Sequence, residues 1–327
     1  MINCEGLKPF LAKEYRNLPE SRYISVLLLR TTQSEAIFRT EGSGEGCSRE
    51  IVADSDGEAV CRAIISKRKQ VAVERREGRQ ILRKYSLLFS QNEKVTDETV
   101  CSMNRNNPCA KCIDCYLYGY AVGGGGAQRS RVISDDAYSL LPFDAVSDKK
   151  TFNALYETGT MRDPVSGKPS SSINEDEYIV AGTHFLDIEV LKDVTEGEFV
   201  YVLGNILRAK RYGAITSRIG SMSNTVLGIA GSDTELFSTL EWVNLTASAL
   251  KKETVEHPQP TGKVVSHAKN AIGSLLKGLC GNYFRASDAE LSIILESVKK
   301  LYASPDILQQ KLRELTGSYP GNEGTVS

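Results

Sequence analysis

Four closely spaced cysteines constrain this 327-residue chain more than any other feature. Cys101, Cys109, Cys112 and Cys115 fall in a segment that holds several asparagines and a proline, which is typical of a loop. Two successive gaps of two residues let neighbouring thiolates point at one ion, and the first cysteine can return to that ion from across the loop. The spacing therefore predicts that the segment folds around a metal.

The ligand set restricts the identity of that metal. Four thiolates select zinc or an iron–sulfur cluster. Three cysteines at two-residue gaps resemble half of a bacterial ferredoxin ligand set. That pattern has a fourth cysteine after a gap of three residues, followed by a proline, and Gly119 and Tyr120 stand at those positions here. We expect structural zinc, with no open coordination position for catalysis. Free thiols and the disulfides of a secreted protein are the alternatives, and no signal-peptide pattern supports secretion.

Basic residues are segregated along a chain whose net charge is only −1. Arg62 to Lys84 holds nine basic residues against two acidic ones, and Asn205 to Arg218 holds four and no acid, while acidic residues gather between Glu175 and Glu198. A charge run is commonly a solvated face. Basic runs with glycines and an aromatic residue between the charges also suit a groove that neutralises phosphates and stacks bases. The candidate contacts are Lys67, Arg68, Lys69, Arg208, Lys210, Arg211, Tyr212 and Arg218.

A glycine-rich segment from Gly119 to Gly126 follows the cysteines. No Gly-Lys-Ser/Thr sequence follows it, and it does not lie between an apolar strand and a helix, so it fits neither common nucleotide-binding loop. Arg129, Ser130 and Arg131 come soon after it. Flexible backbone next to two arginines and a hydroxyl suits contact with a sugar–phosphate chain, and a mobile surface loop is the alternative.

Hydrophobic periodicity predicts an α+β fold with long insertions. An exposed polar arm is expected from Tyr156 to Asp176. The expected helices are Asp56–Lys67, Leu236–Lys252, Val264–Leu279 and Asp288–Tyr302. The expected strands are Tyr23–Thr32, Ala36–Thr40, Gln70–Arg75, Arg79–Leu88, Tyr178–Ala181, Phe185–Val190 and Phe199–Leu207.

Composition and the scarcity of histidine argue against several classes of protein. Hydrophobic residues make up 41% and charged residues 25%, as in globular proteins. No apolar stretch approaches the about 18 residues that a membrane helix needs, so we expect a cytoplasmic protein. The three histidines, His184, His257 and His267, fall in no catalytic or metal-binding pattern. We therefore expect no catalytic residue.

Several motifs in a fixed order resemble one known family. Cys112 to Cys115 is followed by Tyr118-Gly119 and, after the glycines, by Ser130-Arg131-Val132 and Asp136-Ala137. This order is similar to that of the repeat-associated mysterious protein superfamily of CRISPR systems. The segment from Arg208 to Gly213 is similar to the basic glycine-rich loop of that superfamily. With its length and polar arm, the chain most resembles the crRNA-binding backbone family of the type I-D Cascade complex.

The resemblance implies a fold, partners and contacts. The fold is an RRM-like (ferredoxin-like) α+β core with a zinc-binding insertion, a thumb hairpin and a helical C-terminal part. Copies of such a non-enzymatic subunit form a filament along crRNA, join other Cascade subunits and present the guide to a target DNA strand. Carried onto this sequence, the guide contacts are Ser130, Arg131, Arg208, Lys210, Arg211 and Arg218, and the thumb is Gly159–Ser172 with Met161 and Arg162 near its tip.

The resemblance also divides the chain into six segments. In order, they are the first part of the core with a basic insertion, the zinc-binding and glycine-rich insertion, the core continuation, the thumb hairpin, the core strand with the basic glycine loop, and the helical part. They span residues 1–90, 91–128, 129–158, 159–198, 199–235 and 236–327.

The sequence leaves two other functions open. One is a ribonuclease of the same superfamily that cuts target RNA through a thumb aspartate, for which Asp163 stands in a suitable place. The other is an iron–sulfur redox protein. The nucleic-acid interpretation depends on one geometric expectation, which is that Arg131 and Arg211 lie on one side of the molecule along a continuous cationic track.

Overall fold

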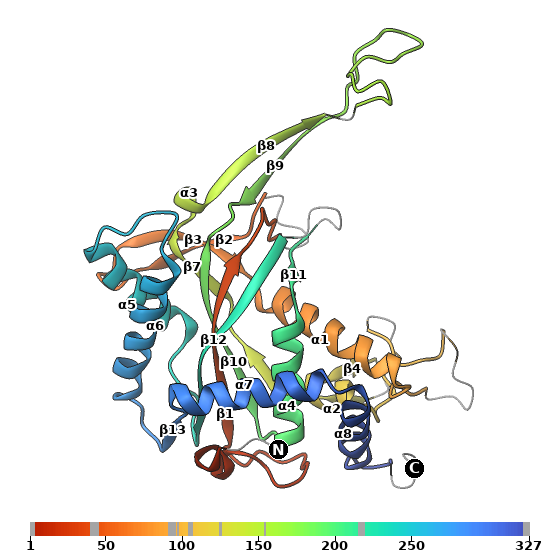
Figure 1. The fold of residues 1–327 in the computed structure, drawn as a ribbon, viewed down its shortest axis with the longest axis vertical. Helices are drawn as coiled ribbons and strands as arrows, with labels where there is room; N and C mark the ends of the chain where they lie inside the picture. Colours follow the sequence, from red (N-terminus) through yellow and green to blue (C-terminus); the bar gives the residue numbers. More distant parts are fainter. Residues whose placement is uncertain are drawn as a thin grey trace.

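The computed structural model describes residues 4–39, 46–90, 96, 98–103, 107–123, 126–153, 155–214 and 220–322. Within these residues, helices cover both faces of a large antiparallel sheet, and one hairpin projects far beyond the sheet (Figure 1). The α+β class expected from the sequence is confirmed. None of the helices in these ranges is long and apolar enough to span a bilayer.

The central sheet has nine strands, and its described pairings are all antiparallel. Seven strands follow the order β11-β12-β1-β10-β7-β3-β2, while β13 pairs with β12 and β6 pairs with β10. Their bounds are β1 Tyr23–Thr32, β2 Arg49–Ala53, β3 Ala59–Ile65, β6 Val132–Ser134, β7 Ala137–Pro142, β10 His184–Lys192, β11 Arg211–Tyr212, β12 Gly220–Ser232 and β13 Tyr283–Arg285.

Two small hairpins and a set of helices complete the fold. The hairpins pair β4 Tyr120–Val122 with β5 Gly126–Gln128 and β8 Ser147–Asn153 with β9 Ile173–Ile179. The helices are the 3-10 helix η1 Glu5–Phe10, α1 Lys67–Lys84, α2 Ile113–Tyr118, α3 Phe143–Val146, α4 Glu196–Arg208, α5 Thr239–Lys252, α6 Thr261–Leu276, α7 Asp288–Tyr302 and α8 Pro305–Gly317.

Strand β1 is buried along almost its whole length because helices cover both of its faces. On one face Ile24, Val26 and Leu28 join a hydrophobic cluster with residues of α4 and α7. On the other face Leu27 and Leu29 pack with residues of α5 and α6. A strand that is buried on two sides has a continuous apolar run instead of alternating polarity. This explains why the sequence predicts β1 so clearly.

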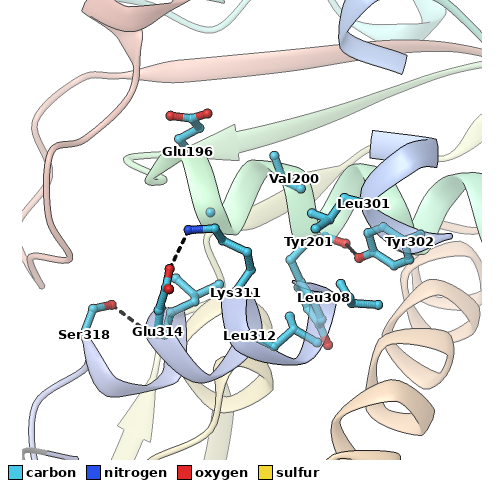
Figure 2. Close-up of a pocket in the computed structure, with 12 residues that line it drawn as sticks. Glu196, Val200, Tyr201, Leu301, Tyr302, Leu308, Lys311, Leu312, Glu314 and Ser318 are labelled. Carbon is cyan, nitrogen blue, oxygen red and sulfur yellow. Dashed lines mark hydrogen bonds and ion pairs between the residues drawn. The ribbon is translucent and has the colours of Figure 1, made fainter. Parts of the chain in front are cut away.

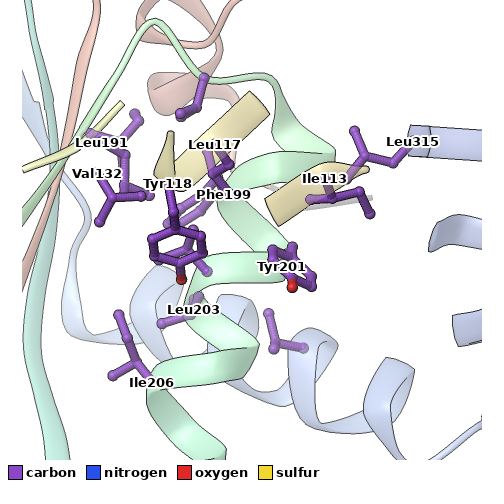
Figure 3. Close-up of a cluster of buried hydrophobic side chains, with 14 of the residues drawn as sticks. Ile113, Leu117, Tyr118, Val132, Leu191, Phe199, Tyr201, Leu203, Ile206 and Leu315 are labelled. Carbon is purple, nitrogen blue, oxygen red and sulfur yellow. The ribbon is translucent and has the colours of Figure 1, made fainter. Parts of the chain in front are cut away.

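Helices α1 and α4 pack closely at Gly78 of α1. A Cβ atom at this position would overlap the hydroxyl of Tyr201 and the side-chain amide of Asn205 on α4. Figure 3 shows Tyr201 and Phe199 of α4 in the same hydrophobic cluster as Tyr118 of α2, the short helix that ends the cysteine segment. The cysteine segment, α1 and α4 therefore share one core.

Helices α7 and α8 pack against the outer side of α4. The hydroxyl of Tyr302 on α7 donates to the backbone carbonyl of Tyr201, at 3.2 Å. A cavity of about 240 Å³ remains between these helices, with Val200, Leu308 and Leu312 among its lining residues (Figure 2). Its walls are mostly apolar, so this groove offers little for recognition of a charged ligand.

The hairpin of β8 and β9 projects away from the central sheet (Figure 1). Its strands pair as far as Asn153 with Ile173. Residues 155–172 form the distal loop, which is largely exposed, and Val165 in the middle of this loop is 96% exposed. The exposed arm expected from Tyr156 onward lies in this projection, and the hairpin itself begins earlier, with β8.

Helix α1 replaces the two strands expected at Gln70–Arg75 and Arg79–Leu88. Valines that alternate with charges suggested strands, but the buried side chains recur at three and four residues, which is the period of a helix. The buried positions of α1 are Gln70, Val73, Glu74, Gly78, Arg79, Ile81 and Leu82. Glu74 and Arg79 are among them, so this helix buries charged side chains as well as apolar ones.

Two further segments have a different secondary structure from the one expected. The strand expected at Phe199–Leu207 lies in α4, which is apolar on several sides because the sheet and other helices surround it. The overlooked signal is a capping box, in which the side chains of Thr195 and Glu198 each accept from the other's backbone N–H. The helix expected at Asp56–Lys67 contains β3, which follows a turn at Gly57 with a φ of +84°.

Most other expected elements are present. β1 spans Tyr23–Thr32 and β10 contains Phe185–Val190, while α5, α6 and α7 overlap the three expected C-terminal helices. Helix α8 was not expected. Of the short strand expected at Ala36–Thr40, the structure shows an isolated bridge between Ala36 and Ile179, and residue 40 lies outside the described ranges.

Candidate metal centre and nucleic-acid interface

The four cysteines predicted to bind metal converge on one point. All four are buried, and their sulfur atoms lie within 4.8 Å of one another. The sulfur of Cys101 lies 3.9 Å from that of Cys112 and 3.6 Å from that of Cys115, and the sulfurs of Cys109 and Cys115 are 3.9 Å apart. None of the four forms a disulfide. The cluster that the spacing predicted is therefore assembled by the fold.

These distances fit a single tetrahedral ion. Sulfur atoms about 2.3 Å from a zinc ion at the centre of a tetrahedron lie about 3.8 Å from each other. The backbone N–H of Cys112 also donates to the sulfur of Cys109, at 3.3 Å, as expected for a thiolate ligand. Four protein ligands fill the coordination of one ion and leave no position for water. A metal held here supports the fold and does not catalyse hydrolysis.

Two arginines of α1 brace the metal centre from one side. Arg79 donates to the sulfur and the carbonyl of Cys101 and to the carboxylate of Asp114. Arg75 forms a bidentate pair with the same carboxylate, with both N···O distances at 2.8 Å, and donates to the carbonyl of Gly119. Asp114 is fully buried. These two cations of the basic run are therefore engaged beside the cysteine cluster and are not available to a ligand on the surface.

The start of α1 presents its cations to solvent. Lys67 and Arg68 are exposed and Lys69 is half-buried. The backbone N–H of Lys67 donates to Asp136, in the turn between β6 and β7, at 2.8 Å, which fixes the first turn of the helix against the sheet. This part of the basic run lies on a surface that an anionic partner can reach.

The residues after the glycine-rich segment divide between surface and interior. Arg129 is exposed, and the hydroxyl of Ser130 donates within its own turn. Arg131 is only 8% exposed, forms an ion pair with Glu198 of α4 and donates to the carbonyl of Asp193 at 3.0 Å. The expected guide contact at Arg131 is corrected, because its charge is neutralised inside the fold.

The second basic run also has an exposed part and a buried part. Arg208, Lys210 and Arg211 are exposed where α4 ends and β11 begins. Tyr212 is 1% exposed, so its ring cannot stack on a base in this structure, and its expected role is corrected. Arg218 lies outside the described residues.

A buried charge network that the sequence analysis missed holds Tyr212 in place. The guanidinium of Arg30 on β1 pairs with Asp187 at 2.6 Å, Glu74 at 2.9 Å and Glu189 at 3.0 Å. The Tyr212 hydroxyl donates to Glu74 at 2.9 Å and accepts from Arg30 at 3.0 Å. Burial raises the pKa of Asp187 to about 6 and also raises that of Glu189. Charged residues inside otherwise apolar strands were the available signal.

The exposed cations gather at one end of the sheet. The contact between Glu74 and Tyr212 holds the first half of α1 against β11. Lys67 begins this helix, seven residues before Glu74, which is about 10 Å along the helix axis. Figure 1 shows the start of α1, β11 and the base of the β8–β9 hairpin in this region. We name this group the exposed cationic surface; it comprises the exposed residues Lys67, Arg68, Arg208, Lys210 and Arg211 and the half-buried Lys69.

The expected track between Arg131 and Arg211 is not formed. Arg131 pairs with the first turn of α4, whereas Arg211 follows the last turn of that helix, and the helix itself separates them by about 15 Å. Because Arg131 is also buried, it does not extend the exposed cationic surface. The surface is therefore built from α1, α4 and β11, without the segment that follows the glycines. The nucleic-acid interpretation no longer has the support of that track and depends on this smaller surface instead.

The tip of the projecting hairpin has a defined turn. Asp163 accepts from the backbone N–H groups of Val165 at 2.8 Å and Ser166 at 3.1 Å, and these hydrogen bonds lower the pKa of its carboxyl below the ordinary value. Arg162 is exposed and donates to a backbone carbonyl of the same loop, and Met161 is half-buried. Both residues expected at the thumb tip lie in this loop.

The fold has a counterpart among solved CRISPR proteins. The chain is similar to the crystal structure of Thermofilum pendens Csc2, with a TM-score of 0.53 and 20% identity over 96% of this chain and 95% of that one. It also matches a type IV-B CRISPR complex (TM-score 0.40, 17% identity, 62% and 90% covered) and a CRISPR RNA-guided surveillance complex (0.46, 11%, 85% and 99%).

The family follows from the sequence itself. The family model described as Csc2 Crispr matches residues 10–312, so the chain belongs to the Csc2 CRISPR family. No curated protein matches the chain. The expected membership of a CRISPR family is thereby confirmed.

Proposed function

We propose that this protein is a non-enzymatic crRNA-binding backbone subunit of a type I-D CRISPR Cascade complex. Copies of it polymerise along the guide RNA as a filament and, with other Cascade subunits, present the guide for pairing with a target DNA strand. Membership of the Csc2 family supports the assignment. The observation that carries it is the group of exposed cations formed by Lys67–Lys69 of α1 and by Arg208, Lys210 and Arg211 beside β11.

The chemistry of this surface suits a guide of any sequence. Lysine and arginine neutralise phosphates whatever the base, and phosphate contacts set position without reading sequence. Tyr212, the aromatic residue of the second run, is buried, so base stacking from this run is not part of the proposal. Met161 and Arg162 at the end of the projecting hairpin remain the proposed contacts to a neighbouring copy and to the RNA held there. Arg129, Ser130 and Arg218 remain proposed contacts.

The proposed core is RRM-like, and the proposed cofactor is one structural zinc ion on Cys101, Cys109, Cys112 and Cys115. The short sulfur–sulfur distances support a single ion instead of an iron–sulfur cluster. A colourless protein with one zinc per chain is the expected result of spectroscopy and elemental analysis. Stoichiometric iron with visible absorbance would revive the redox alternative.

The test of the proposed function is co-purification with RNA. The full chain is expressed with and without a transcript that holds one CRISPR repeat and spacer, and the product is analysed by size exclusion with light scattering and by RNA sequencing. We expect a large assembly that carries RNA of defined length only when the transcript is present. A monomer that carries no RNA under both conditions would contradict the proposal.

The geometry gives less support to a thumb ribonuclease. One carboxylate oxygen of Asp163 is engaged by two backbone N–H groups, which is the role of a turn-capping residue. The test is cleavage of target RNA in the presence of a divalent metal. Cleavage that disappears in the Asp163→Ala variant would favour a ribonuclease over a non-enzymatic filament subunit.

A further inference from the structure

Three cations of the exposed cationic surface lie where α4 ends, and this helix does not end in the common way. The last backbone carbonyls of a helix have no partners within it, and a glycine in the left-handed conformation often closes them. Here Ala209 follows α4 in an extended conformation (φ −65°, ψ 124°), and the first glycine after the helix is Gly213. The carbonyls at this end are therefore satisfied from elsewhere in the fold.

The side chain of Asn224 on β12 closes the end of α4 from the neighbouring sheet. Its Nδ2 donates to the backbone carbonyls of Ile206 at 2.9 Å and Ala209 at 3.0 Å. The same Nδ2 donates to the hydroxyl of Tyr212 on β11, at 3.0 Å. One half-buried amide thus contacts the last turn of the helix, the connection after it and the strand that follows.

Arg30 determines which way this amide faces. Arg30 lies directly opposite Asn224 in the pairing of β1 with β12, and its Nη1 donates to the Oδ1 of Asn224 at 2.9 Å. A guanidinium only donates, so the amide oxygen faces Arg30 and the amide N–H groups face the carbonyls of α4. Arg30 is itself held by the buried carboxylates of Asp187, Glu74 and Glu189. The buried charge network therefore sets the orientation of Asn224.

The backbone fixed by these contacts is the backbone that carries the cations. Arg208 is the last residue of α4, Lys210 lies in the connection and Arg211 begins β11, so each lies within two residues of a group that Asn224 contacts. The carbonyl of Lys210 also accepts from the backbone N–H of Met222 on β12, at 2.9 Å. A backbone that is already fixed reduces the ordering that a ligand has to impose on long side chains.

We propose that Asn224 is a positioning residue for RNA binding, which closes the end of α4 and thereby pre-organises Arg208, Lys210 and Arg211 for contact with the guide backbone. This inference rests on the proposed function, because it assigns phosphate contacts to those three cations. Asn224 acts through the backbone and has no contact of its own with RNA. The hydroxyl of Tyr212 has the same role, because it also donates to Glu74 of α1 at 2.9 Å and so joins the two parts of the exposed cationic surface.

Hydrogen exchange of the full-length protein without RNA tests the local effect. The backbone N–H of Ala209 donates to Asn205 at 3.0 Å, and that of Met222 donates to Lys210, so both report on the end of α4. Asn224→Ala removes the amide that closes this end. The exchange rates of Ala209 and Met222 should then rise by at least about tenfold.

Asn322→Ala is the matched control at the other end of α4. The Nδ2 of Asn322 also donates to two backbone carbonyls, those of Lys111 at 2.8 Å and Thr316 at 2.9 Å. It lies just after α8, where Tyr319 contacts Glu198 in the first turn of α4. This variant loses the same kind of hydrogen bonds, and it should leave exchange at the end of α4 within about twofold of the wild type.

A double-mutant cycle tests the connection to RNA. Affinity for an RNA with one CRISPR repeat and spacer is measured for the wild type, Asn224→Ala, the triple variant of Arg208, Lys210 and Arg211 to alanine, and the combination of the two. Asn224→Ala should weaken binding by the wild type at least about fivefold, because mobile cations have to be ordered on binding. In the triple variant it should change the affinity by less than about twofold, because the side chains through which it acts are gone.

A residue that only supports the fold would reduce the affinity by the same factor in both backgrounds. Equal losses in the two backgrounds, or unchanged exchange at the end of α4, would therefore overturn this proposal alone. A triple variant that binds RNA as tightly as the wild type would contradict the guide-binding role of these cations and, with it, the role of Asn224. If Asn224→Ala does not fold, Tyr212→Phe decides by the same two measurements, since it removes only the hydroxyl that joins β11 to Asn224 and Glu74.

Discussion

The guanidinium of Arg30 is enclosed by the carboxylates of Asp187, Glu189 and Glu74. One positive and three negative charges cannot all persist in a buried site, because desolvation and mutual repulsion of the acids favour protonation. The second oxygen of each of these carboxylates has no hydrogen-bond partner. The network therefore retains a proton, and the stability of the fold depends on pH.

Asp187 gives this dependence a definite sign. Its pKa of about 6 in the folded protein is above the about 4 of an unfolded chain. The stabilisation from its protonated form is therefore complete below about pH 4 and is lost as the pH rises through about 6. We expect the free energy of unfolding of the wild type, relative to Asp187→Asn, to fall by up to about 3 kcal/mol between pH 4 and pH 7.5. Urea unfolding at these two pH values measures it, and a pH-independent difference would contradict it.

The cysteine centre makes an independent prediction. Because the four sulfurs converge on one point, replacing Cys112 and Cys115 by serine removes half of the proposed ligands and should abolish stoichiometric metal binding. Elemental analysis of the purified variant is the measurement, together with its thermal midpoint, which should fall. Cys280→Ser is the control, because Cys280 is exposed and lies outside the cluster. Full metal content in the double variant would refute the centre.

Residue-scale prediction from the sequence succeeded for the convergence of the four cysteines and failed for Arg131. The cysteines were found because ligand spacing is local and is written directly in the chain. Arg129 and Arg131 are two residues apart, yet one is exposed and the other is paired with Glu198. That partner lies 67 residues further along the chain, so no local pattern separates a structural arginine from a surface one.

At the scale of elements, the contact between α1 and α4 depends on the absence of a side chain at Gly78. In an open helix, Gly→Ala is stabilising by roughly 0.5–1 kcal/mol. At Gly78 the added methyl group meets Tyr201 and Asn205, so we expect a net loss of about 1–3 kcal/mol. Gly273→Ala in α6 is the matched control, because an added Cβ there meets no atom closer than 4.0 Å, and it should stabilise. Denaturant unfolding of both variants provides the comparison, and equal effects would reject the close approach.

Elements were predictable where burial and periodicity agree. The continuous apolar run of β1 and the one-sided helices α5 to α7 have the patterns expected of a central strand and of amphipathic helices. Helix α4 is apolar on several sides because it is packed on several sides, and α1 carries buried Gln70 and Glu74 on its inner face. Their patterns depend on the tertiary partners, which the sequence does not reveal.

At the scale of the whole molecule, the β8–β9 hairpin projects beyond the sheet and is the part that we propose to join neighbouring copies. Because Asn153 pairs with Ile173, a two-residue Asn-Gly turn can replace residues 154–172 and close the hairpin. We expect the thermal midpoint to stay within about 2 °C and the RNA-containing assembly to be lost, as measured by light scattering. An assembly of unchanged size would show that the arm does not connect neighbouring copies.

The salt dependence of RNA binding tests most directly whether the cations beside β11 hold the guide backbone. The triple variant of Arg208, Lys210 and Arg211 to alanine should reduce the slope of log affinity against log salt by about 2, because each lost contact with a single strand removes about 0.7. A control triple variant of the exposed residues Lys299, Lys300 and Lys311 to alanine, on α7 and α8, should keep the wild-type slope. An unchanged slope in the first variant would contradict a guide-binding role for these cations.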